Sequence, residues 1–412
     1  MNRHLLVFLD KYVFRIAFYA FVLLARLGRR GQVPFHPEPD EGSHFLVIRP
    51  GGLGDALMAV PFLKILRRSF PKGRITLVLQ KKNQAALKNL PLFDELIVMD
   101  DPKSLFRNIL KILRTRFDVV LDLEPFRKVS SIVSYLSGAA IRVGFDTSSR
   151  RLLYTHHVTY ANEKNYDSLN MTRQLKVIGI DADPREAVDI RCPLPEAALR
   201  NAEKTFAANG LDWESDFVAA VAPGVLKPHH RWVMSRFASL IEYMLEEDPR
   251  TRVVLVGSRA DREDAGEVLG HLRAHDRVLN LVGRTTFMDA LGIFRLCKIL
   301  VACDGGMVYM AASMGCSTIS LWGPGVMERF KPPGEDHVGI RKNYFCVPCV
   351  NYSRLGEFPR CSYDRACIRD ISASEVFYEY RRSKQRLLRG TGTPIEHIPL
   401  EPFKPHTLES LR

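Results

Sequence analysis

Residues 47–61 read VIRPGGLGDALMAVP. A short apolar run is followed by Arg-Pro and three glycines, and Asp55 then opens a segment of helix-forming residues. This order predicts a strand, a glycine loop and a helix, which is the repeating unit of parallel α/β sheets. Two interpretations of the loop remain open at this point. Either its backbone amides bind the phosphates of a nucleotide, or its glycines let a substrate approach Asp55.

Apolar runs separated by amphipathic segments extend through most of the chain. They occur at 44–49, 74–79, 95–99 and 118–123, and again at 217–223, 252–257, 277–283, 299–304 and 318–323. Continuous apolar strands of this kind predict parallel sheets that helices cover on both faces. A stretch rich in Asp and Pro near 180–195 separates the two sets. We therefore expect an α/β protein with two facing Rossmann-like domains, at 44–190 and 191–375.

The positive charge of the chain, +13 in total, is unevenly distributed. Residues 64–88 carry eight lysines and arginines, and no acidic residue stands between Asp55 and Asp94. Such a run is either a solvated face or a surface that meets anionic membrane or a phosphorylated substrate. No nucleic-acid-binding motif accompanies the run, so nucleic acid is not expected as a partner.

The first 31 residues are apolar and basic, unlike the rest of the chain. Their longest charge-free run, 16–25, covers ten residues, whereas a spanning helix needs about 20. The run ends in arginines rather than in the small residues of a signal-peptide cleavage site. We expect a membrane-associating helix at 1–31 that lies in the interface, with packing on the protein's own surface as the alternative. At the other end, 376–412 is expected to be a helix and tail.

The glycine loop departs from the dinucleotide-binding fingerprint. Leu57 stands where the third glycine belongs, and Gln80 follows the second strand where an acidic residue should hold the ribose. A nicotinamide enzyme is therefore disfavoured, and an ordinary helix cap at Asp55 remains an alternative. The second half repeats the pattern at 303–315, which read CDGGMVYMAASMG. Amides exposed by glycines at a helix N-terminus suit a diphosphate.

Taken together, three stretches resemble one family. They are VIRPGGLGDALMAVPFLKILRRSFP, RVGFD (142–146) and DGGMVYMAASMGCSTISLWGP, and the sequence resembles the bacterial heptosyltransferases of glycosyltransferase family nine over roughly 44–380. The resemblance implies a GT-B architecture and transfer of a sugar, of heptose type, from a nucleotide-sugar donor, in this family an ADP-sugar. It implies as acceptor the lipopolysaccharide core or another lipid-linked saccharide, reached by a cytoplasmic enzyme that is peripheral on the inner face of the cytoplasmic membrane.

The family's chemistry assigns roles to particular residues. Transfer is inverting and requires no metal or other cofactor, and Asp55 matches the proposed general base. The donor is expected to contact Gly51, Gly52, Gly54, Gly224, Lys227, His230, Arg231, Asp304, Gly305, Gly306, Met307 and Tyr309. The family places a lysine two residues before a tryptophan in the first loop of the second domain. Since His230 stands at that place, Lys227, His230 or Arg231 must supply the positive charge.

Three donor-side positions depart from the family pattern. Gly305 replaces a usual Ser or Thr, Tyr309 replaces a usual His, and Gly325 replaces a usual Thr. Each change removes a hydrogen bond that the usual side chain would make to the phosphate or sugar of the donor. Two alternatives therefore stay open: a degenerate transferase that binds nucleotide-sugars or glycolipids, and a GT-B-like nucleotide-sugar epimerase that needs no acceptor.

The cysteines and one acidic pair raise the question of metal. Cys346, Cys349, Cys361 and Cys367 form a cluster that either closes a structural zinc site or consists of free thiols. The other four cysteines are expected at strand or helix positions, as buried small hydrophobic residues: Cys192, Cys297, Cys303 and Cys316. Asp181 and Asp183 match an Asp-x-Asp metal motif formally, but they fall between the domains and are expected to form a solvated turn.

Overall fold

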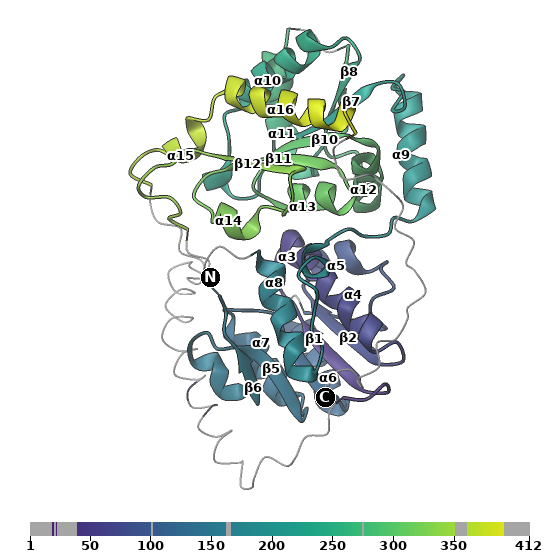
Figure 1. The fold of residues 1–412 in the computed structure, drawn as a ribbon, viewed down its shortest axis with the longest axis vertical. Helices are drawn as coiled ribbons and strands as arrows, with labels where there is room; N and C mark the ends of the chain where they lie inside the picture. The colour runs from purple at the N-terminus through teal and green to yellow at the C-terminus, as the bar shows by residue number, and fades with distance from the viewer. Residues whose placement is uncertain are drawn as a thin grey trace.

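The computed structural model describes residues 19, 22, 39–99, 102–161, 166–273, 276–350 and 361–390. Within them the chain forms two α/β domains, one above the other in Figure 1, each built on a six-stranded sheet. All registered strand pairs in both sheets are parallel. The predicted class, two Rossmann-like domains with parallel sheets, is confirmed.

The first domain contains the sheet β3-β2-β1-β4-β5-β6. Its strands are β1 (His44–Ile48), β2 (Arg74–Leu79), β3 (Glu95–Val98), β4 (Val119–Asp122), β5 (Ile141–Phe145) and β6 (His156–Val158). The connecting helices are α3 (Leu53–Met58), α4 (Val60–Ser69), α5 (Lys81–Leu87), α6 (Pro102–Arg114), α7 (Lys128–Leu136) and α8 (Asp167–Thr172), with short 3-10 helices η2 (Ser148–Leu153), η3 (Arg173–Ile178) and η4 (Glu186–Val188). The central strand β1 is almost wholly buried, as a continuous apolar run in a covered sheet requires.

The second domain contains the sheet β12-β11-β10-β7-β8-β9. Its strands are β7 (Phe217–Ala222), β8 (Thr251–Leu255), β9 (Val278–Asn280), β10 (Ile299–Cys303), β11 (Ser317–Trp322) and β12 (His337–Arg341). Its helices are α9 (Glu196–Ala208), η5 (Pro228–His230), α10 (Met234–Glu247), η6 (Arg259–Asp261), α11 (Arg262–His271), α12 (Phe287–Leu296), α13 (Gly306–Ser313), α14 (Met327–Phe330), α15 (Ala366–Arg369) and α16 (Ala373–Leu388). The last helix, α16, packs on α10 and thus belongs to this domain.

Both sheets follow the same strand order once each domain is counted from its own first strand. The order reverses between β1 and β4 in the first domain and between β7 and β10 in the second. Ligands of open α/β sheets bind beyond the carboxyl ends of the strands at such a reversal. The loops after β1 and β10 carry the two glycine motifs, so topology places both motifs where a ligand is expected.

Each apolar run that predicted a strand forms one, with ends shifted by a few residues at most. The prediction overlooked β5, a buried interior strand whose apolar run is interrupted by Arg142 and Gly144. It also overlooked β6 and β12, which lie at the edges of their sheets. Both edge strands are only partly buried and include polar or charged residues. Edge strands therefore lack the continuous apolar signal that identifies central ones.

The segment 1–31 falls mostly outside the described residues. The two residues of it that are described, Tyr19 and Val22, are helical. Val22 is buried and packs with Leu153 of the first domain, while Lys128 Nζ lies 5.8 Å from the ring centre of Tyr19. At these two positions the contacts are those of packing on the protein's own surface. In the part of the chain that the structure describes, no helix has the length and apolar character needed to cross a bilayer.

Candidate functional site

The first glycine loop follows β1 and leads into α3. Gly52 is the N-cap of α3, and its N–H donates to Asp55 Oδ2 at 2.5 Å. Gly51 lies directly beneath this side chain, since a Cβ at Gly51 would stand 2.6 Å from that of Asp55. The Asp55 side chain nevertheless remains 36% exposed. Asp55 therefore caps the helix, as the helix-cap alternative predicts. Its carboxylate is still accessible to accept a proton from a substrate.

Arg49, at the end of β1, holds the other carboxylate oxygen of Asp55. Its Nη2 donates to Asp55 Oδ1 at 2.9 Å, and its Nη1 donates to the Leu123 carbonyl at 3.0 Å. The same Nη2 lies 3.3 Å from Asp167 Oδ2. Burial by itself would lower the pKa of Arg49, but the carboxylates of Asp55 and Asp167 outweigh it and raise that pKa. Arg49 therefore stays charged although only 2% of its side chain is exposed.

Asp167, the first residue of α8, is a buried carboxylate that the sequence analysis missed. Its Oδ1 accepts from Tyr160 Oη at 2.6 Å and from Arg329 Nε and Nη2 at 3.0 and 2.8 Å. Arg329 belongs to α14 of the second domain. Burial raises the pKa of Asp167 to about 7, against the opposing attraction of Arg49, so its ionised form depends on the cations beside it.

The second glycine loop follows β10. Gly305 is the N-cap of α13, whose first residues are Gly306 and the half-buried Met307. Asp304 precedes them, and its Oδ2 lies 3.1 Å from Nδ1 of His230, a side chain that is 1% exposed. The loop thus combines the amides of a helix N-terminus with a carboxylate that lies beside a buried imidazole.

The two glycine loops meet at the contact between the domains. Helices α3 and α13 pack against each other there (Figure 1). A Cβ at Gly54 would lie 2.6 Å from the ring of Tyr309, and one at Gly306 would lie 2.8 Å from Leu53. The Tyr309 hydroxyl donates to the Phe330 carbonyl at 2.5 Å. The close approach of the helices therefore requires glycine at both positions.

The loop after β7 carries the other predicted donor-binding residues. Arg231 pairs with Asp264 of α11, and its guanidinium lies 3.7 Å from Glu267. His230 is enclosed behind Asp304, as described above, whereas Lys227 is half-exposed. Gly224 packs tightly on the end of η6, since a Cβ there would lie 2.2 Å from the Asp261 carboxylate. His230 and Arg231 thus each lie beside a carboxylate of the second domain.

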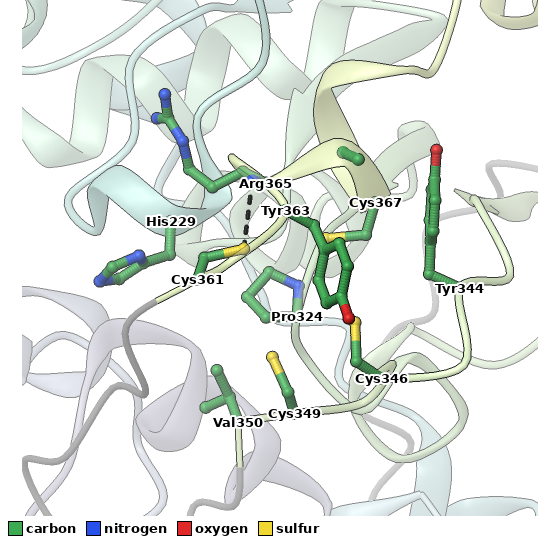
Figure 2. A pocket seen from close by; sticks show the side chains of 11 residues that line it. His229, Pro324, Tyr344, Cys346, Cys349, Val350, Cys361, Tyr363, Arg365 and Cys367 are labelled. Atoms are coloured by element: carbon green, nitrogen blue, oxygen red, sulfur yellow. Dashed lines mark hydrogen bonds between the residues drawn. The ribbon is translucent and has the colours of Figure 1, made fainter.

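The four clustered cysteines, Cys346, Cys349, Cys361 and Cys367, line one small cavity of about 30 Å³ beside His229 (Figure 2). Cys361 Sγ accepts the backbone N–H of Arg365 at 3.2 Å. Burial, with the neighbouring cysteines, raises the pKa of Cys349 and raises that of Cys367 to about 11, which favours neutral thiols at neutral pH. Among the described residues, which omit 351–360, no three His, Cys, Asp or Glu side chains are grouped to hold a metal ion. The predicted zinc site therefore has no support.

Three of the remaining cysteines are buried as predicted, Cys192 lies outside any helix or strand and is not, and the Asp-x-Asp pair is exposed as predicted. Cys297, Cys303 and Cys316 are buried and Cys192 is half-buried. Burial raises the pKa of Cys303 to about 12. The aspartates at 181 and 183 are both exposed in the connection between the domains.

The basic segment 64–88 is largely neutralised by acids from elsewhere in the chain. The pairs are Lys64–Asp189, Arg67–Asp94, Arg68–Glu186, Lys72–Glu41 and Arg74–Glu95. These acidic partners lie outside the segment in sequence, so the charge of residues 64–88 alone does not include them. Such pairs cancel much of the local positive potential, and they favour the interpretation as a solvated face.

Comparison with known proteins gives one consistent result. The model of glycosyltransferase family 9 (heptosyltransferase) matches residues 106–357. Lipopolysaccharide heptosyltransferase 2 of Escherichia coli (strain K12) is 26% identical over 304 residues, covering 70% of this chain and 84% of that protein.

The solved structures agree. The E. coli ADP-heptose LPS heptosyltransferase II has a TM-score of 0.66 at 20% identity, covering 84% of this chain and 99% of that one. An E. coli heptosyltransferase with ADP-2-deoxy-2-fluoro heptose has a TM-score of 0.62 at 15% identity, covering 82% and 99%. These likenesses confirm the predicted GT-B architecture.

Proposed function

Because the chain belongs to glycosyltransferase family 9 (heptosyltransferase), we propose that it transfers a heptose from ADP-heptose to a lipid-linked saccharide, such as the lipopolysaccharide core. The observation that carries this proposal is the meeting of the two glycine loops, with the half-buried Asp55 carboxylate on one side and the N-terminus of α13 on the other. The relatives support the choice of substrates through the lipopolysaccharide and ADP-heptose in their names.

Asp55 acts as general base in the proposed reaction. Its carboxylate takes the proton of the acceptor hydroxyl while the acceptor oxygen attacks the anomeric carbon of the heptose. The bond from that carbon to the diphosphate breaks on the opposite side, so ADP leaves and the anomeric configuration inverts. Arg49 and Gly52 hold the carboxylate in place, and a carboxylate suffices as base when the proton moves as an oxocarbenium-like centre is attacked.

The departing diphosphate is stabilised by the second domain in this proposal. The amides of Gly305 and Gly306 stand at the N-terminus of α13, where the helix dipole favours negative charge. Lys227, which is half-exposed in the loop after β7, supplies the positive charge. No step of this scheme uses a metal ion or another cofactor.

A screen of ADP-, GDP-, UDP- and CDP-sugars against the purified full-length protein tests the choice of donor. ADP-heptose at about 100 times its dissociation constant is expected to stabilise the native state by about 2.7 kcal/mol and so raise Tm by several degrees. Mass spectrometry with a saccharide acceptor should then detect an added heptose. Stabilisation by a different nucleotide series alone, with no transfer from ADP-heptose, would contradict the proposed donor.

A binding module without transferase activity is the second candidate. One observation favours it: the Tyr309 hydroxyl is engaged by the Phe330 carbonyl, and Gly305 and Gly325 offer no side-chain hydroxyl to a donor. ADP-heptose binding without transfer to any lipid-linked saccharide would support this candidate. Product that appears without an acceptor would instead indicate the epimerase alternative.

We also propose that the enzyme is peripheral on the inner face of the cytoplasmic membrane, where a lipid-linked acceptor would be reached. Because five cations of the segment 64–88 are paired with acids, the segment should add little to membrane binding. In co-sedimentation with vesicles containing anionic lipid, removal of residues 1–31 is expected to lower the bound fraction severalfold. Replacement of Lys81 and Lys88 by Gln should change it less than twofold. A larger loss from the lysine replacements than from the truncation would refute this assignment.

A further inference from the structure

The side chain of Arg329 crosses from the second domain into the first. It extends from α14, is 5% exposed, and places its guanidinium 4.4 Å from the ring centre of Tyr160 and 5.9 Å from that of Phe126. Both rings belong to the first domain. Such stacking suits the planar guanidinium group and does not suit lysine equally well.

In the first domain the Arg329 guanidinium meets a carboxylate that is itself buried. Nε and Nη2 of Arg329 donate to Asp167 Oδ1, while Asp167 Oδ2 lies 3.3 Å from Arg49 Nη2. The same Arg49 nitrogen donates to the Asp55 carboxylate at 2.9 Å. Four charged side chains thus form one continuous path from the second domain to Asp55.

The charges along this path balance only when the domains are in contact. Arg49 and Arg329 face Asp167 and Asp55, so two cations oppose two carboxylates. If Arg329 withdrew, Asp167 would keep Arg49 as its remaining charged partner, and burial disfavours an under-compensated carboxylate. Arg49 would then be drawn toward Asp167 and away from Asp55. The position of the Asp55 carboxylate consequently depends on whether the second domain is in place.

We infer that Arg329 and Asp167 are positioning residues that couple contact between the two domains to the placement of the Asp55 carboxylate. This inference rests on the proposed function, in which Asp55 is the base. Through this coupling, the Asp55 carboxylate is correctly placed only when the second domain, which binds the donor, is in contact with the first domain. Neither residue is required to touch either substrate.

Arg329→Met and Arg329→Lys in the full-length enzyme test the coupling. Methionine removes the positive charge and the paired N–H donors of the guanidinium, and kcat is expected to fall about 30-fold. The dissociation constant of ADP, measured by calorimetry, should change less than threefold. Lysine keeps the charge without the paired geometry, and should restore part of kcat. Asp167→Asn should resemble Arg329→Met, and circular dichroism establishes that each variant folds.

The matched control is Arg273→Met. Arg273 also pairs with carboxylates of its own neighbourhood, Glu242 and Glu246, but is 74% exposed and lies away from the contact between domains. Its kcat should remain at the wild-type value. A folded Arg329→Met enzyme with wild-type kcat would overturn the inference.

A double variant separates this inference from the proposed role of Asp55. If Arg329 acts through Asp55, then Asp55→Asn/Arg329→Met should be no slower than Asp55→Asn alone. A further 30-fold loss in the double variant would show that Arg329 acts elsewhere and would overturn the coupling while leaving Asp55 as base. Wild-type turnover in Asp55→Asn would instead overturn the proposed mechanism. In that case X-ray scattering still tests the domain contact, because Arg329→Met with ADP should have a larger radius of gyration than wild type with ADP.

Discussion

Replacing Asp55 by Asn is expected to lower kcat by about 10³-fold, which is the size of contribution that a general base makes. The amide oxygen can still accept the Gly52 N–H, so α3 keeps its cap, but the side chain no longer takes a proton. Arg49 keeps Asp167 and the Leu123 carbonyl as partners. Steady-state transfer of heptose measures the loss, and calorimetry with ADP should show donor-side affinity within threefold of wild type.

Asp289→Asn is the matched control for this substitution. Asp289 is also the third residue of a helix, α12, and also accepts the N–H of its own N-cap, Thr286. It therefore has the capping role of Asp55 without a place at the meeting of the glycine loops. We expect wild-type turnover from Asp289→Asn. Equal turnover in both variants would reduce Asp55 to a helix cap and remove it from the mechanism.

The substitution Gly54→Val is expected to separate the two domains. The Cβ of the new side chain would lie 2.6 Å from the Tyr309 ring. This ring cannot move away freely, because it is buried and its hydroxyl donates a hydrogen bond to the Phe330 carbonyl. Overpacking of this kind costs about 3 kcal/mol. We expect kcat/KM to fall at least 10²-fold and Tm to fall by several degrees, measured by heptose transfer and by calorimetric unfolding.

Two further variants test whether contact with Tyr309 causes the expected loss. Gly266→Val introduces the same side chain into α11, where a Cβ has no neighbour within 4 Å, and should leave both activity and Tm nearly unchanged. Gly54→Val/Tyr309→Ala provides space for the new methyl groups and should recover Tm. If Gly54→Val alone were as active and stable as wild type, then α3 and α13 would not be in contact during turnover.

The fold was predictable because its signal is local and repeated. An apolar run such as 44–49 must be buried on both faces wherever it lies, and alternation with amphipathic segments leaves few other architectures. The glycine motifs were recognisable for a related reason. Gly54 and Gly306 have no side chain because another helix fills that space, and this requirement is visible in sequence as glycine at the start of a helix.

The ion-pair partners were not predictable, because a charged residue in the sequence does not indicate which distant residue it will pair with after folding. The segment 64–88 has the composition of a strongly basic surface, yet five of its eight cations pair with Glu41, Asp94, Glu95, Glu186 and Asp189 in the folded protein. Likewise, nothing in the sequence indicated that Arg231, a candidate for binding the diphosphate, pairs with Asp264 in the folded protein. For Arg49 the sequence did carry one indication, since a charged residue at the end of a buried strand needs a partner.

By itself, the sequence determined the two parallel sheets, the position of the glycine loops at strand ends and the family to which these loops belong. These features follow from short-range patterns, because periodic burial and backbone clearance act on neighbouring residues. Only the tertiary structure decided that Asp167 and Arg329, separated by 162 residues, share one buried ion pair next to Asp55. An ion pair across two domains depends on how their surfaces dock, and no local pattern in the chain encodes that distance.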